Sequence, residues 1–315
     1  MALNDAQIRL FLQEDEEESA ARTAKYTGKS PFHLAAIRLA RNRLALFCFV
    51  VIMLFILIAI LSNFNILGLH DKALQFNDGT MANRYLPFGS PGHILGTDNL
   101  GRDILARVLM GTKVSLFLGF VSGLLMVPIA VIVGSLSGYF GGWFDELSQY
   151  VMSVIIAIPG ILIIMSLIQM MGKDFFTIAF AFAITGWVGL SRVIRGTFIQ
   201  AREFEYVLAA RALGANSTRI IFKHILPNVF HFVIIQFVLY FISVIKSEVF
   251  LAYIGLSMVG VPTWGVMIDN SRNEVINGNW QNLAGPTLFM FIFLVCLNIF
   301  GDALRDALDP KLRNM

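Results

Sequence analysis

The chain has 315 residues, of which 57% are hydrophobic and only 14% are charged, and its mean hydropathy is +0.71. These values lie far outside the range of soluble globular proteins and indicate an integral membrane protein. A net charge of +3 is too small to suggest a nucleic-acid partner, so the positions of the basic residues are more informative than their number.

Residues 1–43 form a polar segment with an acidic run at Glu14–Glu18 and several basic residues after it. The apolar run that follows is long and lacks a small-residue cleavage pattern, so 1–43 is predicted to be a cytosolic tail and not a signal peptide. Gly28-Lys29-Ser30 imitates the end of a phosphate-binding loop. Thr23 replaces the first glycine of that motif and no strand precedes it, which argues against nucleotide binding there.

Six apolar runs are long enough to cross the ~30 Å hydrocarbon core as helices, so the fold is predicted to be all-α and polytopic. The first run, 44–62, is followed by a long hydrophilic segment, 63–111. Residues 112–306 contain the other five runs, and 307–315 form a polar tail. The five later runs are 114–136, 147–171, 175–190, 229–249 and 286–300.

The distribution of basic residues predicts which side of the membrane each segment faces. Seven Lys and Arg lie in the N-terminal tail, six in 192–228 and three near the C-terminus, against seven on the opposite side. By the positive-inside rule, both termini and 192–228 are cytoplasmic, whereas 63–111 and 252–285 are extracytoplasmic. The turn 137–146 is an exception, because it should also be inside yet carries two acidic residues and no basic one.

A dense group of polar and glycine residues precedes the second span. Its members are His93, Gly96, Thr97, Asp98, Gly101, Arg102 and Asp103. Histidine, aspartate and arginine in one short run are the chemistry of a metal or catalytic site, but a structural role is favoured. We expect Thr97 or Asp98 to cap a helix and Arg102 to pair with a nearby carboxylate. No metal site and no catalytic residue is predicted.

The cytoplasmic segment 192–228 has the pattern of two helices joined by a tight turn. Good helix formers over 202–213 predict a short amphipathic helix with Phe204 and Leu208 on one face. Gly214 is expected to end it with φ > 0. Asn216-Ser217 can cap a second helix, which Pro227 is predicted to interrupt.

Within this segment, the motif residues Ala209, Ala210, Gly214, Leu226 and Pro227 resemble the signature loop of the membrane subunits of ABC importers. The family glutamate that precedes the alanines is Leu208 here, and Glu205 lies one turn earlier, so the resemblance leaves open which carboxylate, if any, makes the polar contact. The resemblance implies that this loop docks into a groove on a cytosolic ATPase. The implied coupling residues are Glu205, Leu208, Ala209, Ala210, Gly214, His224, Leu226 and Pro227. The alternative is an amphipathic interfacial helix without a partner.

The run His93–Asp103 is similar to a His-x-Leu-Gly-Thr-Asp-x-x-Gly-Arg-Asp stretch of the dipeptide, oligopeptide and nickel ABC importer family, in its C-type permease branch. Tyr139–Gly142, Trp264-Gly265 and Gly301–Pro310 fit the same branch. The resemblance implies a type I importer transmembrane domain that forms half of a peptide pathway in the cytoplasmic membrane of a prokaryote, surrounded by lipid. A nickel complex or another small solute is the alternative cargo.

The same resemblance implies the partners of the chain. They are a second homologous permease that completes a heterodimer, two cytosolic ATPase subunits that bind ATP-Mg, and an extracytoplasmic peptide-binding protein. The chain itself lacks a Walker motif, so it is expected to hold no cofactor and to perform no covalent chemistry.

Lys246, Glu248 and Trp264 are candidates for an outer gate or a contact with the binding protein. Lys246 lies about 25 Å along the fifth span at 1.5 Å per residue, close to the outer interface. Snorkelling or a structural ion pair is favoured there over a role in the substrate path. Cys48 and Cys296 lie inside apolar runs and are expected to behave as small hydrophobes.

Two rival classes of function remain open from the sequence. A secondary transporter or channel would need ionisable residues near the bilayer midplane or an internal repeat, and neither is clear. A membrane-embedded enzyme would need a paired acid and base or a metal cluster, for which the only dense polar run is His93–Asp103.

Overall fold

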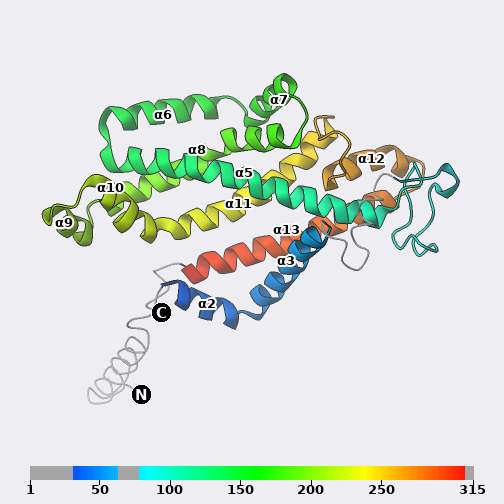
Figure 1. Ribbon diagram of the computed structural model, residues 1–315, viewed down its shortest axis with the longest axis horizontal. Helices are drawn as coiled ribbons and strands as arrows, with labels where there is room; N and C mark the ends of the chain where they lie inside the picture. Colours follow the sequence, from blue (N-terminus) through cyan, green and yellow to red (C-terminus); the bar gives the residue numbers. More distant parts are fainter. Residues whose placement is uncertain (1–30, 63–77, 309–315) are drawn as a thin grey trace, which may run out of the picture.

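The computed structural model describes residues 31–62 and 78–308, and these ranges are almost entirely helical (Figure 1). The predicted cytosolic tail 1–43 lies outside the described residues over 1–30, as does the C-terminal tail over 309–315. The elements are α2 Pro31–Arg41, α3 Arg43–Leu61, the short 3-10 turn η2 Met81–Asn83, α5 Ile104–Phe140, α6 Gly142–Ala157, α7 Gly160–Met171, α8 Phe175–Ala201, α9 Glu205–Ala212, α10 Ser217–Arg219, the π-helical η3 Ile220–Ile225, α11 Leu226–Tyr253, α12 Trp264–Ile276 and α13 Gln281–Leu308.

Within the part of the chain that the structure describes, five helical stretches are long and apolar enough to cross a membrane, namely α3, α5, α8, the continuous helix 217–253 and α13. A sixth span is formed if α6 and α7 are counted together, but these two helices meet at an angle of 83°. The run predicted as a span over 147–171 therefore corresponds to two helices with a sharp bend between them. Pro159 is the cause, because it disfavours helical geometry in Ile158, which is extended with ψ 128°.

The helix that leads out of the cytoplasmic segment is also different from the prediction, because Pro227 does not interrupt it. Helix runs without a break from Ser217 to Tyr253 through the π-helical turn η3. In that turn the Leu226 amide donates to the Ile221 carbonyl, one residue further back than in an α-helix. This wider turn lies directly before Pro227, which has no N–H to donate, so the change to π geometry accommodates the proline inside the continuous helix.

Helices α5 and α8 pack backbone to backbone at the centre of the bundle. A Cβ on Gly134 or Gly138 would lie only 2.6 Å from a carbonyl oxygen of α8, so only glycine permits this approach. In Figure 1, α6 and α7 lie along one side of this pair, and α3 and α13 lie along the other. The core is therefore layered around α5 and α8.

The loops gather at the two ends of the bundle. Helices α9 and α10 extend beyond one end, and the C-terminal end of α13 and the helix α2 lie toward that same end (Figure 1). Residues 78–103 and α12 lie at the opposite end. The two segments that the sequence marked as functional candidates thus occupy opposite poles of the molecule.

Candidate functional site

Helix α9 is short because its two ends are fixed by local backbone geometry. It begins at Glu205 and not at Arg202 as predicted, because Phe204 is extended with ψ 144°. At the other end Gly214 has φ +80°, as expected. Its amide donates to the Arg211 carbonyl at 3.0 Å, and the next amide, of Ala215, donates to the Ala210 carbonyl at 3.0 Å. This pair of bonds is a Schellman motif, which ends the helix sharply.

The turn after Gly214 leads directly into the second helix. The Asn216 side chain accepts a hydrogen bond from the Arg219 amide at 2.8 Å, so Asn216 caps the new helix as predicted. Ile220, Ile221 and Ile225 of η3 are buried. The chain thus reverses through a turn with two hydrogen-bonded caps before it enters α11.

A single buried side chain attaches α9 to the bundle. Val207 is fully buried in a core cluster with Phe198 of α8 and the three isoleucines of η3. The face that the sequence marked as apolar points away from this core, because Phe204 is 51% exposed and Leu208 is 44% exposed. The sequence pattern grouped Phe204 and Leu208 on one face without placing that face, and tertiary packing covers Val207 instead.

The residues expected to couple to a partner fall into two groups. Glu205, Leu208 and Ala209 are exposed and share one side of α9 through their spacing of three and four residues. Ala210 is half-buried against the bundle side. Of the residues further along, His224 and Leu226 are half-buried, whereas Gly214 and Pro227 are exposed. The exposed side of α9 thus presents leucine, alanine and a carboxylate beyond the end of the bundle.

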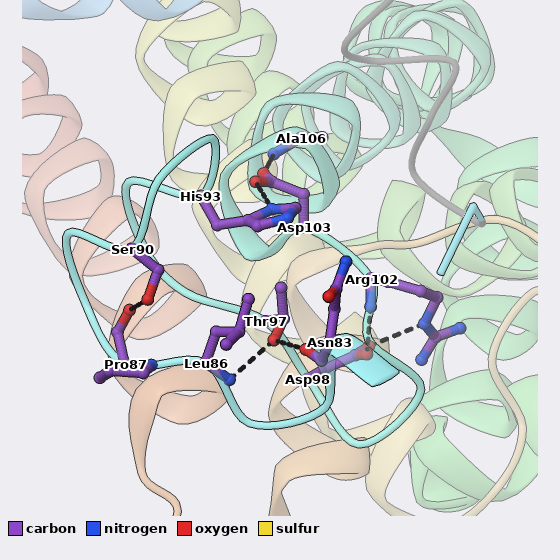
Figure 2. A network of polar contacts seen from close by, with 10 residues as sticks. All are labelled: Asn83, Leu86, Pro87, Ser90, His93, Thr97, Asp98, Arg102, Asp103 and Ala106. Carbon is purple, nitrogen blue, oxygen red and sulfur yellow. Dashed lines mark hydrogen bonds and ion pairs between the residues drawn. The ribbon is translucent and has the colours of Figure 1, made fainter. Parts of the chain in front are cut away.

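The outer loop, residues 78–103, is organised around the fully buried carboxylate of Asp98 (Figure 2). Its Oδ1 accepts the amides of Leu100 and Arg102, both at 2.9 Å. Its Oδ2 accepts from the Arg102 Nε at 2.7 Å and faces the Arg107 Nε at 3.7 Å. The expected pairing of Arg102 with a carboxylate is confirmed. The sequence did not predict that Arg107 would be buried in the same cluster.

The N-cap of α5 is Asp103, so the prediction that Thr97 or Asp98 caps this helix is wrong. The Asp103 Oδ1 accepts the Ala106 amide at 2.7 Å, and its Oδ2 lies 2.8 Å from the His93 Nδ1 (Figure 2). Thr97 instead accepts the Leu86 amide at 2.9 Å and donates to the Asn83 carbonyl. These side chains are engaged in folding the loop, which supports the structural interpretation of the run.

Two glycines allow the outer loop to fold back on itself closely. Gly96 has φ +76°, and a Cβ there would lie 2.3 Å from the Leu86 carbonyl oxygen. Gly101 has φ +73°, and a Cβ there would lie 2.0 Å from the Thr80 carbonyl oxygen. Both positions therefore require glycine for conformation and for space.

The outer loop is fastened to α12 by a carboxylate of that helix. The Asn99 amide donates to the Glu274 Oε1 at 3.2 Å. Burial raises the pKa of the Glu274 carboxyl above its ordinary value, while the Asn99 amide opposes the shift. This contact joins segments that are far apart in the sequence, so no local pattern could have indicated it.

The three outer-gate candidates differ in their surroundings. Trp264 is fully buried, with its ring 6.3 Å from Phe55 and 5.9 Å from Phe293, so it cannot contact a partner in this arrangement. Glu248 is buried and accepts a hydrogen bond from the Thr263 hydroxyl. Lys246 alone is exposed. The three residues therefore do not form one exposed surface in this arrangement, because the first turn of α12 packs into the core between α3, α5 and α13. Their role in an outer gate stays a prediction.

One polar site was missed by the sequence interpretation. Asp145 in the first turn of α6 accepts from the Arg195 Nε and Nη2, both at 2.6 Å, and from the Ser137 hydroxyl. The signal was the acidic turn 137–146 that violated the positive-inside count. Arg195 of α8 neutralises the charge of Asp145 at the end of this turn. Only the packing of α6 against α8 shows which basic residue does so.

A bundle of long apolar helices that extends an exposed loop helix beyond one end is the architecture of a polytopic membrane protein. Residues 130–314 match the family described as the binding-protein-dependent transport system inner membrane component. Residues 30–74 match the N-terminal TM domain of oligopeptide transport permease C. The chain belongs to this family of inner-membrane transport components, and it is a permease subunit, with ATP hydrolysis carried by a separate subunit.

Curated relatives match nearly the whole chain. It is 34% identical to the dipeptide transport system permease protein DppC of Bacillus subtilis (strain 168), over 96% of this chain and 93% of the relative. It is 37% identical to the oligopeptide transport system permease protein OppC of the same organism, over 89% of each. It is 35% identical to the glutathione transport system permease protein GsiD of Pectobacterium atrosepticum, over 71% of this chain and 75% of the relative.

Proposed function

We propose that the chain forms half of the translocation pathway of an ATP-driven peptide importer, with a second, related permease completing the pathway. Its relatives are named as dipeptide, oligopeptide and glutathione permeases, which supports a peptide as the cargo. Two cytosolic ATPases supply the energy with ATP-Mg, and an extracytoplasmic binding protein delivers the peptide. Lipid surrounds the outward faces of the bundle.

The observation that carries this proposal is the exposed side of α9. A protein surface rarely leaves large apolar side chains uncovered without a partner, and Leu208 and Leu213 are 44% and 88% exposed. A groove on an ATPase would cover them, and Ala209 would let that surface approach the α9 backbone. Glu205 is the exposed carboxylate of this side, so we assign to it the polar contact that the family glutamate makes.

The packing of α9 supports a lever mechanism. Val207 and the isoleucines of η3 belong to one core cluster, and η3 continues without a break into α11. A force applied to α9 by a closing ATPase would therefore act on α11 along a rigid helix. In this mechanism the permease performs no covalent step and converts the ATPase movement into alternating access.

The test compares two glycines that have the same left-handed backbone conformation at opposite ends of the molecule. Gly214 has φ +80° and Gly278 has φ +84°, and a Cβ at either position would meet nothing within 4 Å. Gly214→Val and Gly278→Val should each cost about 1 kcal/mol or more in local conformation. Only Gly214→Val should reduce co-purification of the ATPase subunits and peptide uptake, because it misdirects the second helix of the loop.

A charge placed on the docking side gives an independent arm of the test. Ala209→Glu would bury an unpaired carboxylate at the contact, which costs several kcal/mol when no partner is present. The variant should insert normally and lose ATPase association. Wild-type uptake with normally bound ATPase in both Gly214→Val and Ala209→Glu would overturn the coupling role of this loop.

The orientation of the chain in the membrane is part of the proposal. Both termini and the α9 loop are cytoplasmic, and residues 78–103 and α12 are extracytoplasmic, as the count of basic residues predicts. Reporter fusions at Gly214 and Met315 should show that these positions lie in the cytoplasm. Fusions at Asp78 and Asn277 should show that those positions lie outside. An extracytoplasmic signal at Gly214 would contradict docking to a cytosolic ATPase.

A further inference from the structure

The ion pair between Asp145 and Arg195 connects three helices close to the root of the α9 loop. Arg195 lies on α8 about two helical turns before that helix ends at Ala201. Its guanidinium binds both carboxylate oxygens of Asp145 at 2.6 Å, a geometry that is stronger and more directional than a single contact. The Ser137 hydroxyl of α5 donates to the same carboxylate.

The two partners of the pair belong to parts of the bundle that are held very differently. The end of α8 is fixed, because Gly138 of α5 packs against the backbone of Arg195 and Phe198 lies in the core cluster with Val207. The beginning of α6 is not fixed in this way. Between Gly142 and Leu147 no side chain is buried, and Trp143 is 74% exposed.

Helix α6 is bounded by a break at its other end. It buries only Ser148 and Met152, and it meets α7 at the 83° bend of Ile158-Pro159. Helix α7 is anchored separately, because Ile164 belongs to a different core cluster, which includes Ile178 and Phe182 of α8. The first turn of α6 is therefore weakly packed, whereas Met152 further along the helix lies in the same core cluster as Phe198 of α8. The bidentate ion pair is a polar contact that joins this first turn to α8.

We propose that Asp145 and Arg195 are positioning residues that make α6 follow the end of α8 when the α9 loop moves. The proposal rests on the proposed function, in which an ATPase moves α9. Because Val207 packs with the end of α8 and the start of η3, that movement reaches α8 and α11 directly. It reaches the first turn of α6 through the carboxylate of Asp145. Without the pair, the α9 loop would move and the first turn of α6 would not follow it.

The surroundings of the Asp145–Arg195 ion pair allow it to break and re-form during repeated movement. The side chains are 28% and 19% exposed for Arg195 and Asp145, so neither charge is sealed from water. A partly solvated pair can be pulled apart and re-formed without leaving an uncompensated buried charge. The Ser137 hydroxyl can donate or accept, so it can stabilise either sign of charge at the α6 position.

The experiment reconstitutes the complete importer, with both permeases, the ATPases and the binding protein, and measures peptide imported per ATP hydrolysed. Asp145→Asn and Arg195→Gln should retain bound ATPase subunits and ATP hydrolysis, yet import about fivefold less peptide per ATP, the lower end of typical coupling effects. The exchanged pair, Asp145→Arg with Arg195→Asp, should recover most of the loss. The matched control is Asp269→Asn, which removes an exposed ion pair with Arg272 on α12 and should leave the ratio unchanged.

Retention of bound ATPase subunits and of ATP hydrolysis by the single variants separates positioning from a simple folding defect, and recovery by the exchanged pair attributes the loss to the ion pair itself. The proposal that Asp145 and Arg195 couple α6 to α8 would be overturned by either of two results. One is a wild-type ratio of imported peptide to hydrolysed ATP in the single variants, and the other is an exchanged pair that is as poorly coupled as the single variants. Failure of the wild-type chain to retain ATPase subunits would instead overturn the proposed function. The two failures are therefore distinguishable in one set of preparations.

Discussion

The two loops at opposite ends of the bundle are attached to it by opposite means. The outer loop, 78–103, buries charged and polar side chains around Asp98 and brings glycines within contact distance of backbone carbonyls. The α9 helix at the opposite end is held by Val207 and leaves Leu208 exposed. The polar groups around Asp98 are satisfied within this chain, with Arg107 of α5 and Glu274 of α12 contributing contacts to the outer loop. The exposed side of α9 has the composition expected of a surface that a partner covers, as proposed above.

This contrast explains why the motif residues behave so differently. In the outer loop, His93, Thr97, Asp98, Arg102 and Asp103 all contact residues of the same chain. In α9, Glu205, Leu208 and Ala209 face away from the chain. Motif residues that face inward indicate a folding requirement, and motif residues that face outward indicate a partner.

The largest expected effect is that of Asp98→Asn in the outer loop. The substitution removes the charge that faces Arg102 and Arg107, and breaking a buried ion pair from one side costs about 3–5 kcal/mol. The melting temperature of the purified protein in detergent should fall clearly. Asp269→Asn breaks a more exposed pair and should cost below about 1 kcal/mol. Equal melting temperatures for the two variants would mean that buried charge does not stabilise the outer loop.

An intermediate effect is expected for Gly101→Ala, with Gly89→Ala as its control. Both glycines lie in the outer loop with φ near the same value, +73° and +77°, so both variants incur about 1–2 kcal/mol of backbone strain. Only at Gly101 would the new Cβ meet a backbone oxygen, at 2.0 Å, which adds about 1–3 kcal/mol of overpacking. Limited proteolysis from the outer side should cleave the Gly101 variant faster. Equal cleavage rates would show that the close approach is not maintained.

The smallest expected effect on stability distinguishes two neighbours in α9. Val207→Ala removes two buried methyl groups, which should cost about 1.5 kcal/mol and increase amide hydrogen exchange over 205–225. Leu208→Ala should leave hydrogen exchange of the isolated permease unchanged and weaken ATPase association. If Leu208→Ala increased exchange as much as Val207→Ala, the exposed side of α9 would be packed in solution and the contrast between the two loops would fail.

The sequence alone determined the features that depend on neighbouring residues. Hydropathy located the spans because an uncharged apolar run of sufficient length is stable only as a membrane helix, whatever it packs against. Gly214 and Asn216 predicted the turn after α9 because backbone conformation and capping are local properties. The motif residues sufficed to indicate the family for the same reason, since they lie in short continuous runs.

Only the tertiary structure decided which side of each element is covered. Val207 is buried in place of Leu208, and Trp264 is buried in place of facing outward, because helices distant in the sequence pack on them. Arg195 compensates Asp145 for the same reason, across the packed helices α6 and α8. Burial and ion pairing depend on the neighbours that folding brings together, and those neighbours are set by the whole bundle and not by the local run of residues.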